Sequence, residues 1–330
     1  MKEVWVFIEQ EDGVVHPVSY ELLGVADRLS KDLDGIACAV LIGYQVEPLA
    51  EELFSYGAQK VYLVEHEVLK YYRHIPYAKT LAELSKKYKP EIFLLGATPL
   101  GRDLAGGVAT LLETGLTADV TELNIDRETK NLLMTRPAYG GNIMATIICP
   151  YHRPQMATVR PRIFPIPEKK PQAIGEIIRE SIELKEEEAR VERIDFIPKE
   201  KSVNLEYADV IVAGGKGLGS KEGFSILQEL AKLLKGEVGA SRLAVEAGWI
   251  SYEHQVGQTG KTVRPKVYFA FGISGAIQHR AGMQNSDIII AVNTDERAPI
   301  FQIADLGIIG DWKEVATALI KAIKEIKKYE

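Results

Sequence analysis

The first half of the chain alternates between short apolar runs and longer segments with apolar residues at helical spacing. Residues 4–9 and 92–96 are apolar runs typical of buried strands, whereas 19–33 and 100–112 place apolar residues three and four positions apart. Strands that alternate with helices of about ten to fifteen residues indicate βαβ units. The pattern therefore predicts an α/β domain with a parallel sheet.

After about residue 118 the pattern changes to short β-like pieces. These pieces, 132–136, 143–148 and 156–160, favour an antiparallel edge or ribbon added to the same domain.

A boundary follows. Pro165, Pro167 and Pro171 lead into a stretch rich in Lys and Glu around 185–188, which is typical of a solvated linker with an exposed strand. Alternation then resumes, with helices predicted at 222–234 and 312–328 and strands at 210–213, 237–239, 266–271, 288–293 and 306–309. The chain is thus predicted to form two Rossmann-like or flavodoxin-like parallel-sheet domains, 1–204 and 205–330.

Composition narrows the class of protein. The chain has 330 residues, 46% of them hydrophobic and 26% charged, with a net charge of -6. The chain lacks the excess of positive charge that is typical of nucleic-acid-binding proteins, and no segment is apolar enough for membrane insertion. The N-terminus lacks the pattern of a targeting segment, and Cys38 and Cys149 have no CxxC or metal-ligand spacing. We expect a cytoplasmic, prokaryotic protein with buried free thiols.

Small and polar residues follow nearly every predicted strand of the second half, and far fewer follow those of the first half. Ligands of open parallel sheets bind beyond the carboxyl ends of the strands. The second half is therefore predicted to bind a ligand, and the first half to act as a scaffold. The segments after strands are GGKGLGS at 214–220, ASR at 240–242, GISGAIQH at 272–279, NTD at 293–295 and GD at 310–311, and QVGQTGKT at 255–262 lies before the strand at 266–271.

Taken one at a time, these segments are weak signals. GGKGLGS fits no dinucleotide-binding register, and GQTGKT cannot be a P-loop because Pro265 prevents the helix that such a loop opens. Ser241 and Asp311 could simply cap helices, and Asn293 and His279 could be structural. No pairing of a nucleophile with a base and no metal-ligand spacing stands out, so any chemistry belongs to a bound organic cofactor.

Longer motifs identify a relationship. The run GASRLAVEAGW at 239–249, the segment from QVGQTGKTVRP to LGIIGD at 255–311, and GATPLGRDLAGG at 96–107 resemble the alpha subunit of electron transfer flavoprotein, the FixB family. The resemblance covers essentially the whole chain. It implies an FAD held by the second domain and a first domain that packs against a beta subunit.

The family also implies roles for individual residues. Thr259 would meet the flavin N5, His279 the C2 carbonyl, and Arg242 the isoalloxazine ring. Lys216, where many relatives carry Arg, would reach the phosphates but lose the bidentate fork of a guanidinium. The remaining contacts would come from Val256, Gly257 and Gln258 to the ring and ribityl chain, from Ser241, Ser274, Gly275, Ala276, Ile277 and Gln278 to ribityl and pyrophosphate, and from Asn293, Asp311 and Trp312 to the AMP end.

A positive group beside the flavin would stabilise the negative charge that one-electron reduction creates. A guanidinium or imidazolium about 4 Å away is worth on the order of 4 kcal/mol at an effective dielectric constant near 20. Arg242 and His279 are therefore candidates for tuning the redox potential, and Thr259, which the resemblance places at the flavin N5, is a third.

Three functions fit these features. The first is a carrier, rather than a stand-alone enzyme, that passes single electrons from an acyl-CoA dehydrogenase-type donor to a quinone-linked oxidoreductase, a ferredoxin or a flavodoxin. The second is an NADH-oxidising, electron-bifurcating assembly with another FAD on the beta subunit. A remote third is a non-redox nucleotide-binding module. The first two differ on the beta subunit, so this chain alone leaves both open.

Overall fold

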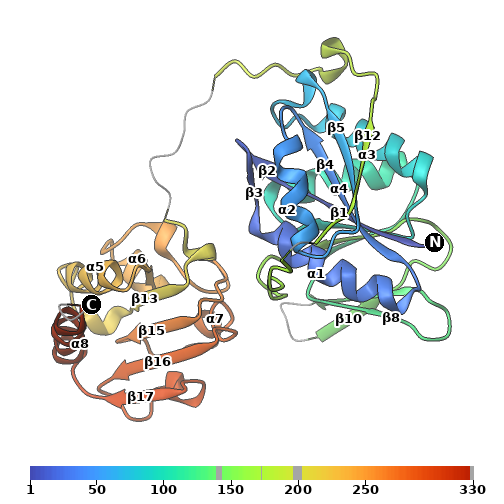
Figure 1. The fold of residues 1–330 in the computed structure, drawn as a ribbon. Coiled ribbons are helices and arrows are strands. Elements are labelled where there is room, and N and C mark those ends of the chain that lie inside the picture. The colour runs from blue at the N-terminus through green and yellow to red at the C-terminus, as the bar shows by residue number, and fades with distance from the viewer. Residues whose placement is uncertain (139–142, 172, 196–202, 328–330) are drawn as a thin grey trace. The chain divides into compact units, whose positions relative to one another are not determined.

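The computed structural model describes residues 1–138, 143–171, 173–195 and 203–327 (Figure 1). The chain divides into two compact units, unit 1 from Met1 to Asp195 and unit 2 from Phe196 to Glu330. The boundary expected from the sequence, between residues 204 and 205, falls slightly later in the chain. Across the described residues, no helix has both the length and the apolar character needed to cross a membrane.

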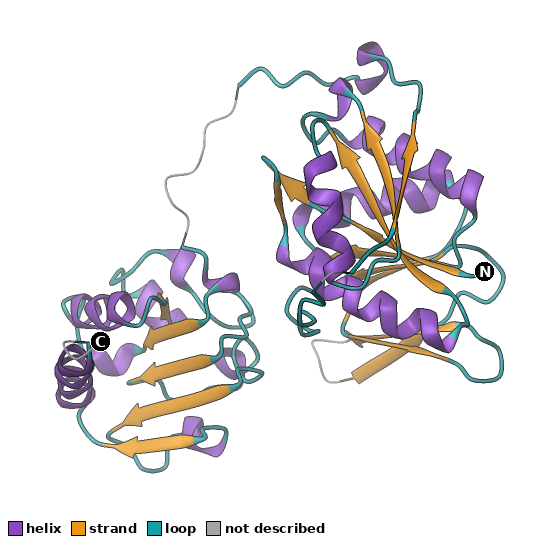
Figure 2. Cartoon of the chain, in the orientation of Figure 1, coloured by secondary structure: helices purple, strands orange, loops and turns teal. Residues whose placement is uncertain are grey.

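Unit 1 is built on a seven-stranded parallel sheet with strand order β12-β5-β4-β1-β6-β11-β7. Helices lie on both faces of this sheet (Figure 2). The strands are β1 Glu3–Phe7, β4 Ile36–Gly43, β5 Lys60–Glu65, β6 Ile92–Gly96, β7 Leu116–Val120, β11 Gln155–Val159 and β12 Glu176–Glu180, and the helices are α1 Pro17–Asp32, α2 Ala50–Ser55, α3 His74–Tyr88 and α4 Pro99–Leu111.

Alternation along β1 explains the two cores of unit 1. Val4 and Val6 pack into the core beneath α1 and α2, whereas Trp5 and Phe7 pack into the core beneath α3 and α4. All four side chains are buried, as expected for a central parallel strand that has helices on both faces.

An antiparallel sheet of three strands, in the order β10-β9-β8, is added to unit 1 as predicted. Its strands are β8 Glu122–Ile125, β9 Leu132–Ala138 and β10 Ile143–Ile147, and a small hairpin pairs β2 Gln10–Glu11 with β3 Val14–Val15. The prediction was wrong for 156–160. Met156 belongs to β11, which pairs in parallel with β6 and β7, and all five residues of β11 are buried, as is typical of a strand within a parallel sheet.

The charged segment before the unit boundary is only in part the solvated linker predicted from its composition: residues 185–188 are exposed as predicted, and residues 196–202 lie outside the described residues. Ile182, Leu184 and Ala189 are buried, so the segment packs against unit 1. Lys79 Nζ on α3 lies 2.8 Å from a carboxylate oxygen of Glu188. The apolar residues between the charged ones make the segment pack against unit 1. A count of residue types over the segment does not reveal them. Of the two free cysteines, Cys38 is buried as expected, but Cys149 is partly exposed.

Unit 2 holds a five-stranded parallel sheet with strand order β14-β13-β15-β16-β17. Two long helices, α5 and α8, cover one face, and the other face is covered by α7 with the loops around Val256, Val263 and Ile300. The strands are β13 Val210–Gly214, β14 Glu237–Ala240, β15 Val267–Phe271, β16 Ile288–Asn293 and β17 Leu306–Ile309, and the helices are α5 Gly223–Leu233, α6 Arg242–Glu246, α7 Ile277–Arg280 and α8 Trp312–Ile326.

The strand order of unit 2 places the topological switch point between β13 and β15. The chain leaves β13 to form β14 on one side and returns to form β15 on the other. Flavodoxin-like sheets have this order and bind their ligands at this point. The loops that follow β13 and β15 are therefore the first place to look for a site.

Candidate functional site

Glycines allow the two loops at the switch point to meet backbone to backbone. The amide of Gly215 donates to the carbonyl of Phe271 over 2.9 Å, and the amide of Gly217 donates to Gly272 over 3.0 Å. A Cβ at Gly215 would lie 2.1 Å from the carbonyl oxygen of Gly272, and Gly272 itself has a φ of 59°. Side chains at these positions would separate the loops.

Backbone donors line the segment after β15. Among the described residues, the amides of Ser274, Gly275, Ala276, Ile277 and Gln278 donate no hydrogen bond to another part of the chain. Gly275 is buried, whereas the other four residues of this segment are exposed. Five consecutive free N–H groups can bind a polar or anionic ligand.

Polar side chains flank these donors. The Nδ2 amide of Asn293, at the end of β16, donates to the carbonyl of Ile273 over 3.0 Å and so holds the segment in place. Lys216 is exposed in the 3-10 turn Lys216–Leu218 that follows β13. Lys216 therefore lies in the loop whose next residue, Gly217, bonds to Gly272 just before the free amides.

Ser241 stands at the N-cap position of α6 at the end of β14, but its side chain makes no capping hydrogen bond, contrary to the capping role considered from the sequence. The amide of Ser241 donates to the carbonyl of Gly214 over 3.0 Å, but its Oγ is buried with no hydrogen-bond partner among the described residues. The Nε of Arg242 lies 2.8 Å from a carboxylate oxygen of Glu246, and the Arg242 side chain is 64% exposed. Such an exposed pair is weak, so the guanidinium can change partner at little cost.

Asp311 and Trp312 have structural roles at the start of α8. One carboxylate oxygen of Asp311 accepts hydrogen bonds from the amides of Lys313, over 2.8 Å, and Glu314, over 3.1 Å. This is the N-cap suggested by the sequence. The Trp312 ring is half-buried and packs beside Gly223, where a Cβ would lie 3.1 Å away. A contact of either residue with a ligand stays a prediction.

The QVGQTGKT and GISGAIQH motifs pack against each other. The amide of Gln258 donates to the carbonyl of Gln278 over 2.7 Å, and a Cβ on Gly282 would lie 2.4 Å from the nitrogen of Gly257. The amide of Val256 donates to Ala240 over 2.9 Å, which ties this loop to the end of β14. The two motifs therefore form one continuous surface, residues 255–262 with 272–279, which is joined to the end of β14.

Thr259, in the QVGQTGKT motif, is held in place through both its side chain and its backbone carbonyl. Its Oγ1 accepts a hydrogen bond from the Nε2 amide of Gln255 over 3.1 Å, and its carbonyl accepts from the hydroxyl of Tyr252 over 2.6 Å. Thr259 itself is exposed. Its hydroxyl hydrogen therefore stays free to donate outward.

His279 on α7 is buried against the face of the sheet and is 7% exposed. Its Nε2 lies 3.0 Å from the hydroxyl of Tyr268 on β15, and its Nδ1 is buried with no partner among the described residues. Burial lowers the pKa of His279 to about 4, and a contact with the backbone of Val256, which does not reach the geometry of a hydrogen bond at Nδ1, only partly opposes this shift. The ring is thus neutral at pH 7, which favours a hydrogen-bonding role over the imidazolium charge considered from the sequence.

Comparisons with known proteins agree on the family. Residues 4–184 match the electron transfer flavoprotein domain, and residues 204–284 match the electron transfer flavoprotein FAD-binding domain. The chain belongs to the electron transfer flavoprotein alpha subunit family. An electron transfer flavoprotein subunit alpha of Thermoanaerobacterium thermosaccharolyticum is 51% identical over 99% of both chains. Protein FixB of Azorhizobium caulinodans is 50% identical over 98% of this chain and 89% of its own.

The unsatisfied groups of unit 2 fit the flavin that this family implies. The Ser241 hydroxyl and the His279 Nδ1 are both buried and lack partners among the described residues, and Ser274 to Gln278 present free amides. A flavin nucleotide carries a polar ring edge, a polyhydroxyl chain and phosphates, which can satisfy donors of all three kinds. These groups lie at the carboxyl ends and along the α7 face of this sheet.

The sequence-based reading missed the residues that support this site. Tyr268 lies inside the apolar run predicted as a strand at 266–271, and its hydroxyl contacts His279. Gln255 holds Thr259, and Glu246 pairs with Arg242. The four-residue spacing of Arg242 and Glu246 is a readable helix signal. The contact between Tyr268 and His279 has no signal in local spacing, because only the packing of α7 creates it.

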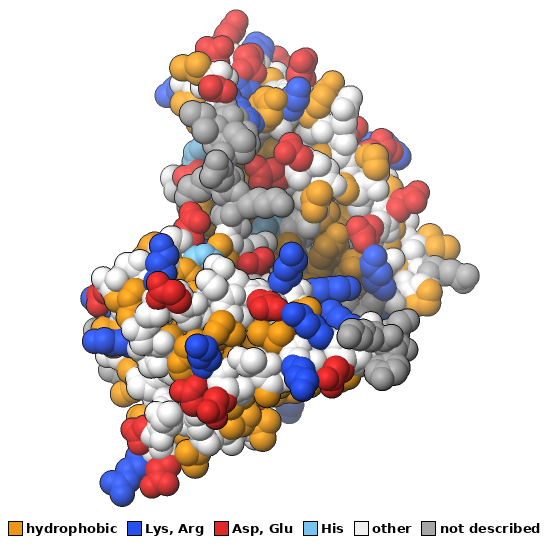
Figure 3. Space-filling view, turned by 90° about the vertical axis from the view of Figure 1, so that its left-hand side faces the viewer, with side chains coloured by type: hydrophobic (Ala, Val, Ile, Leu, Met, Phe, Trp, Pro, Cys, Tyr) orange, Lys and Arg blue, Asp and Glu red, His pale blue; other side chains and the backbone are white. Residues whose placement is uncertain are grey.

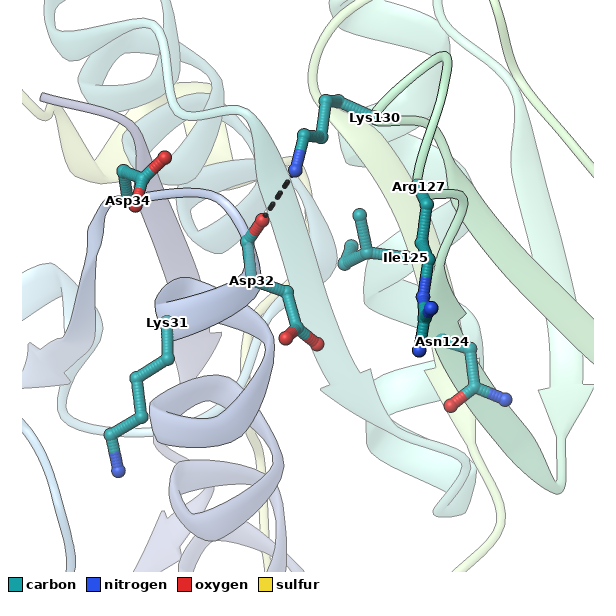
Figure 4. Close-up of a pocket in the computed structure, with 7 residues that line it drawn as sticks. All are labelled: Lys31, Asp32, Asp34, Asn124, Ile125, Arg127 and Lys130. Atoms are coloured by element: carbon teal, nitrogen blue, oxygen red, sulfur yellow. Dashed lines mark hydrogen bonds between the residues drawn. The ribbon is translucent and has the colours of Figure 1, made fainter.

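Two surface hollows lie among other residues. In unit 1, a pocket of about 600 Å³ lies between the end of α1 and the turn after β8, where Lys130 Nζ donates to the carbonyl of Asp32 over 3.2 Å (Figure 4). In unit 2, a shallower hollow of about 370 Å³ lies between Phe224 and Trp249. Charged side chains of both signs are interspersed on the face shown in Figure 3. Neither hollow contains a residue predicted to bind the flavin.

Proposed function

We propose that this chain is the alpha subunit of a heterodimeric electron transfer flavoprotein and holds FAD on unit 2. It relays electrons singly between a dehydrogenase, such as an acyl-CoA dehydrogenase, and a quinone-linked or other oxidoreductase. The supporting observation is a group of polar atoms that have no hydrogen-bond partner among the described residues and lie at the carboxyl ends of the unit 2 strands and on the α7 face: Ser241 Oγ, His279 Nδ1 and the amides of Ser274–Gln278. The cytoplasmic location stays a prediction.

The residues around this group divide the work of binding. The free amides and Lys216 would hold the phosphates, because N–H groups and an ammonium favour anionic oxygens. The Thr259 hydroxyl and the His279 Nδ1 would hold the polar edge of the ring, and Arg242 would add a positive charge beside it. When bound, the flavin supplies one- and two-electron redox chemistry. The chain positions it and biases its potential.

The beta subunit is proposed to cover the antiparallel sheet of unit 1. Ile143 and Met144 on β10 are each 54% exposed, and Ile148 just beyond is 51% exposed. Among the described strands, β10 pairs only with β9, so its other edge is open. An open edge with exposed apolar side chains is a typical protein-binding surface. Replacing Met144 with Lys should reduce co-purification of the beta subunit, and Val14→Lys, at another exposed apolar position, is the control.

Flavin stoichiometry of the co-purified heterodimer tests the function. One FAD with one AMP per heterodimer supports the simple carrier, whereas two FADs that NADH can reduce support the electron-bifurcating assembly. A colourless heterodimer that takes up no FAD would contradict both and support the nucleotide-binding module. Reduction by an acyl-CoA dehydrogenase and its substrate then tests the proposed donor.

A further inference from the structure

We propose that Tyr268 is a positioning residue that donates its hydroxyl hydrogen to Nε2 of His279 and thereby fixes the imidazole tautomer with the hydrogen on Nδ1. The proposal rests on the proposed function, because Nδ1–H is then the donor that faces the flavin. The supporting observation is that the buried hydroxyl oxygen of Tyr268 lies 3.0 Å from Nε2 of His279. The other ring nitrogen, Nδ1, has no hydrogen-bond partner among the described residues.

Hydrogen-bond accounting favours this direction of donation. Tyr268 is fully buried, and His279 is its hydrogen-bond contact among the described residues. If Nε2–H donated instead, the tyrosine would keep a buried hydroxyl hydrogen without an acceptor, and Nδ1 would present a bare lone pair. If Tyr268 donates, Nδ1–H is the one donor that the pair leaves over. Unpaired buried donors are costly, so the second arrangement is favoured once a ligand accepts from Nδ1.

The surroundings hold both rings in place. Tyr268 is central in unit 2, since β15 is flanked by β13 and β16. His279 lies on α7, and the carbonyl of the preceding residue, Gln278, accepts a hydrogen bond from the amide of Gln258. The two ring centroids are 6.2 Å apart and the planes meet at 61°, an edge-to-face arrangement. A ring fixed on both sides can hold one tautomer, because rotating to exchange its nitrogens would break this packing.

The charge state agrees with this geometry. Burial raises the pKa of Tyr268 well above its usual range, so its hydroxyl keeps its hydrogen. Burial also keeps the imidazole uncharged. A neutral imidazole has one donor and one acceptor nitrogen, and the nitrogen that accepts determines the other as donor. Tyr268, held in place on β15, would thus make Nδ1 of His279 on α7 the nitrogen that donates a hydrogen bond.

The first test is the tautomer itself, measured on the purified heterodimer with isotope-labelled histidine by nuclear magnetic resonance. The His279 signal, assigned with His279→Gln, should show a hydrogen on Nδ1 in the natural protein. Tyr268→Phe should give a mixture of tautomers or the reverse one. The control is Tyr77→Phe, which removes a buried hydroxyl that donates to the carbonyl of Leu69 in unit 1. A hydrogen on Nε2 in the natural protein would overturn the proposal.

The second test is the flavin reduction potential of the same variants. Tyr268→Phe should change the one-electron equilibrium about tenfold, or about 59 mV, and should have no further effect in a His279→Ala background. An equal shift in that background would contradict a role through His279, and so would an unchanged potential. If the heterodimer binds no flavin, the proposed function fails, while the tautomer measurement still decides the role of Tyr268.

Discussion

The two parallel sheets of this protein end very differently at their switch points. In unit 1 the switch point lies between β1 and β6, where Thr98 Oγ1 donates to the Glu9 carboxylate over 2.6 Å and accepts from the Gly101 amide over 2.9 Å. The Glu9 amide donates to Ser19 Oγ over 2.9 Å. In unit 2, the equivalent position leaves donors unpaired. We therefore expect ligand binding at the switch point of unit 2, where donors have no partner among the described residues, and not at that of unit 1.

Breaking the backbone contact between the two loops at the switch point of unit 2 should have the largest effect. Gly215→Ala places a Cβ 2.1 Å from the Gly272 carbonyl oxygen, so the loops must separate. We expect flavin content to fall below about a tenth of normal and unit 2 to lose roughly 1–3 kcal/mol of stability. Gly106→Ala on α4, which has no atom within 4 Å of the new Cβ, is the control. Normal flavin content in Gly215→Ala would show that the loops do not form the site.

Opening the closed switch point should affect stability alone. Thr98→Val removes the N-cap of α4 and the hydrogen bond to Glu9, at a cost of about 1–2 kcal/mol. Flavin affinity and potential should stay the same, because unit 1 is scaffold in this comparison. Thr110→Val, later in α4, loses an exposed bond to the Gly106 carbonyl and should cost less. A loss of flavin from Thr98→Val in protein that stays folded would place part of the site on unit 1.

The positive charge at the end of β14 should have a moderate effect on potential. Arg242→Ala should lower the flavin potential by roughly 40 mV, corresponding to about 1 kcal/mol for a one-electron couple. This is well below the value expected from the sequence, because the guanidinium is 64% exposed and paired with Glu246. Lys266→Ala, at the opposite end of β15, is the matched control. A spectroelectrochemical titration with unchanged couples would remove Arg242 from the site.

The smallest effect should be a pH dependence at Glu9. Burial raises the pKa of Glu9, the hydrogen bond from Thr98 opposes this, and the charge of Glu11 adds to it. A carboxyl with a raised folded-state pKa adds stability below its unfolded pKa and loses it as pH rises through the folded value. Glu9→Gln should therefore be more favourable at pH 8 than at pH 4, measured by denaturant unfolding. The same gain at both pH values would contradict this.

The sequence could predict most of the fold because periodicity reports burial directly. The helices α1, α4, α5 and α8 and the strands of unit 2 were predicted within a few residues of their bounds. Gln155–Val159 was misassigned because its short apolar run, next to two genuine ribbon strands, does not reveal which sheet it joins. The same limit applies to Ile182 and Leu184, whose burial depends on a surface formed by α3 far away in the chain.

For the site, the sequence by itself determined the family, the glycine positions and the residue types that can bind a flavin. Long motifs such as QVGQTGKT and GISGAIQH carry that information in consecutive residues. The tertiary structure decided which of these groups lack an internal partner, that His279 is neutral, and that Tyr268 on β15 contacts it. The hydrogen-bond partners and the burial of these groups come from segments distant in sequence, so no local pattern specifies them.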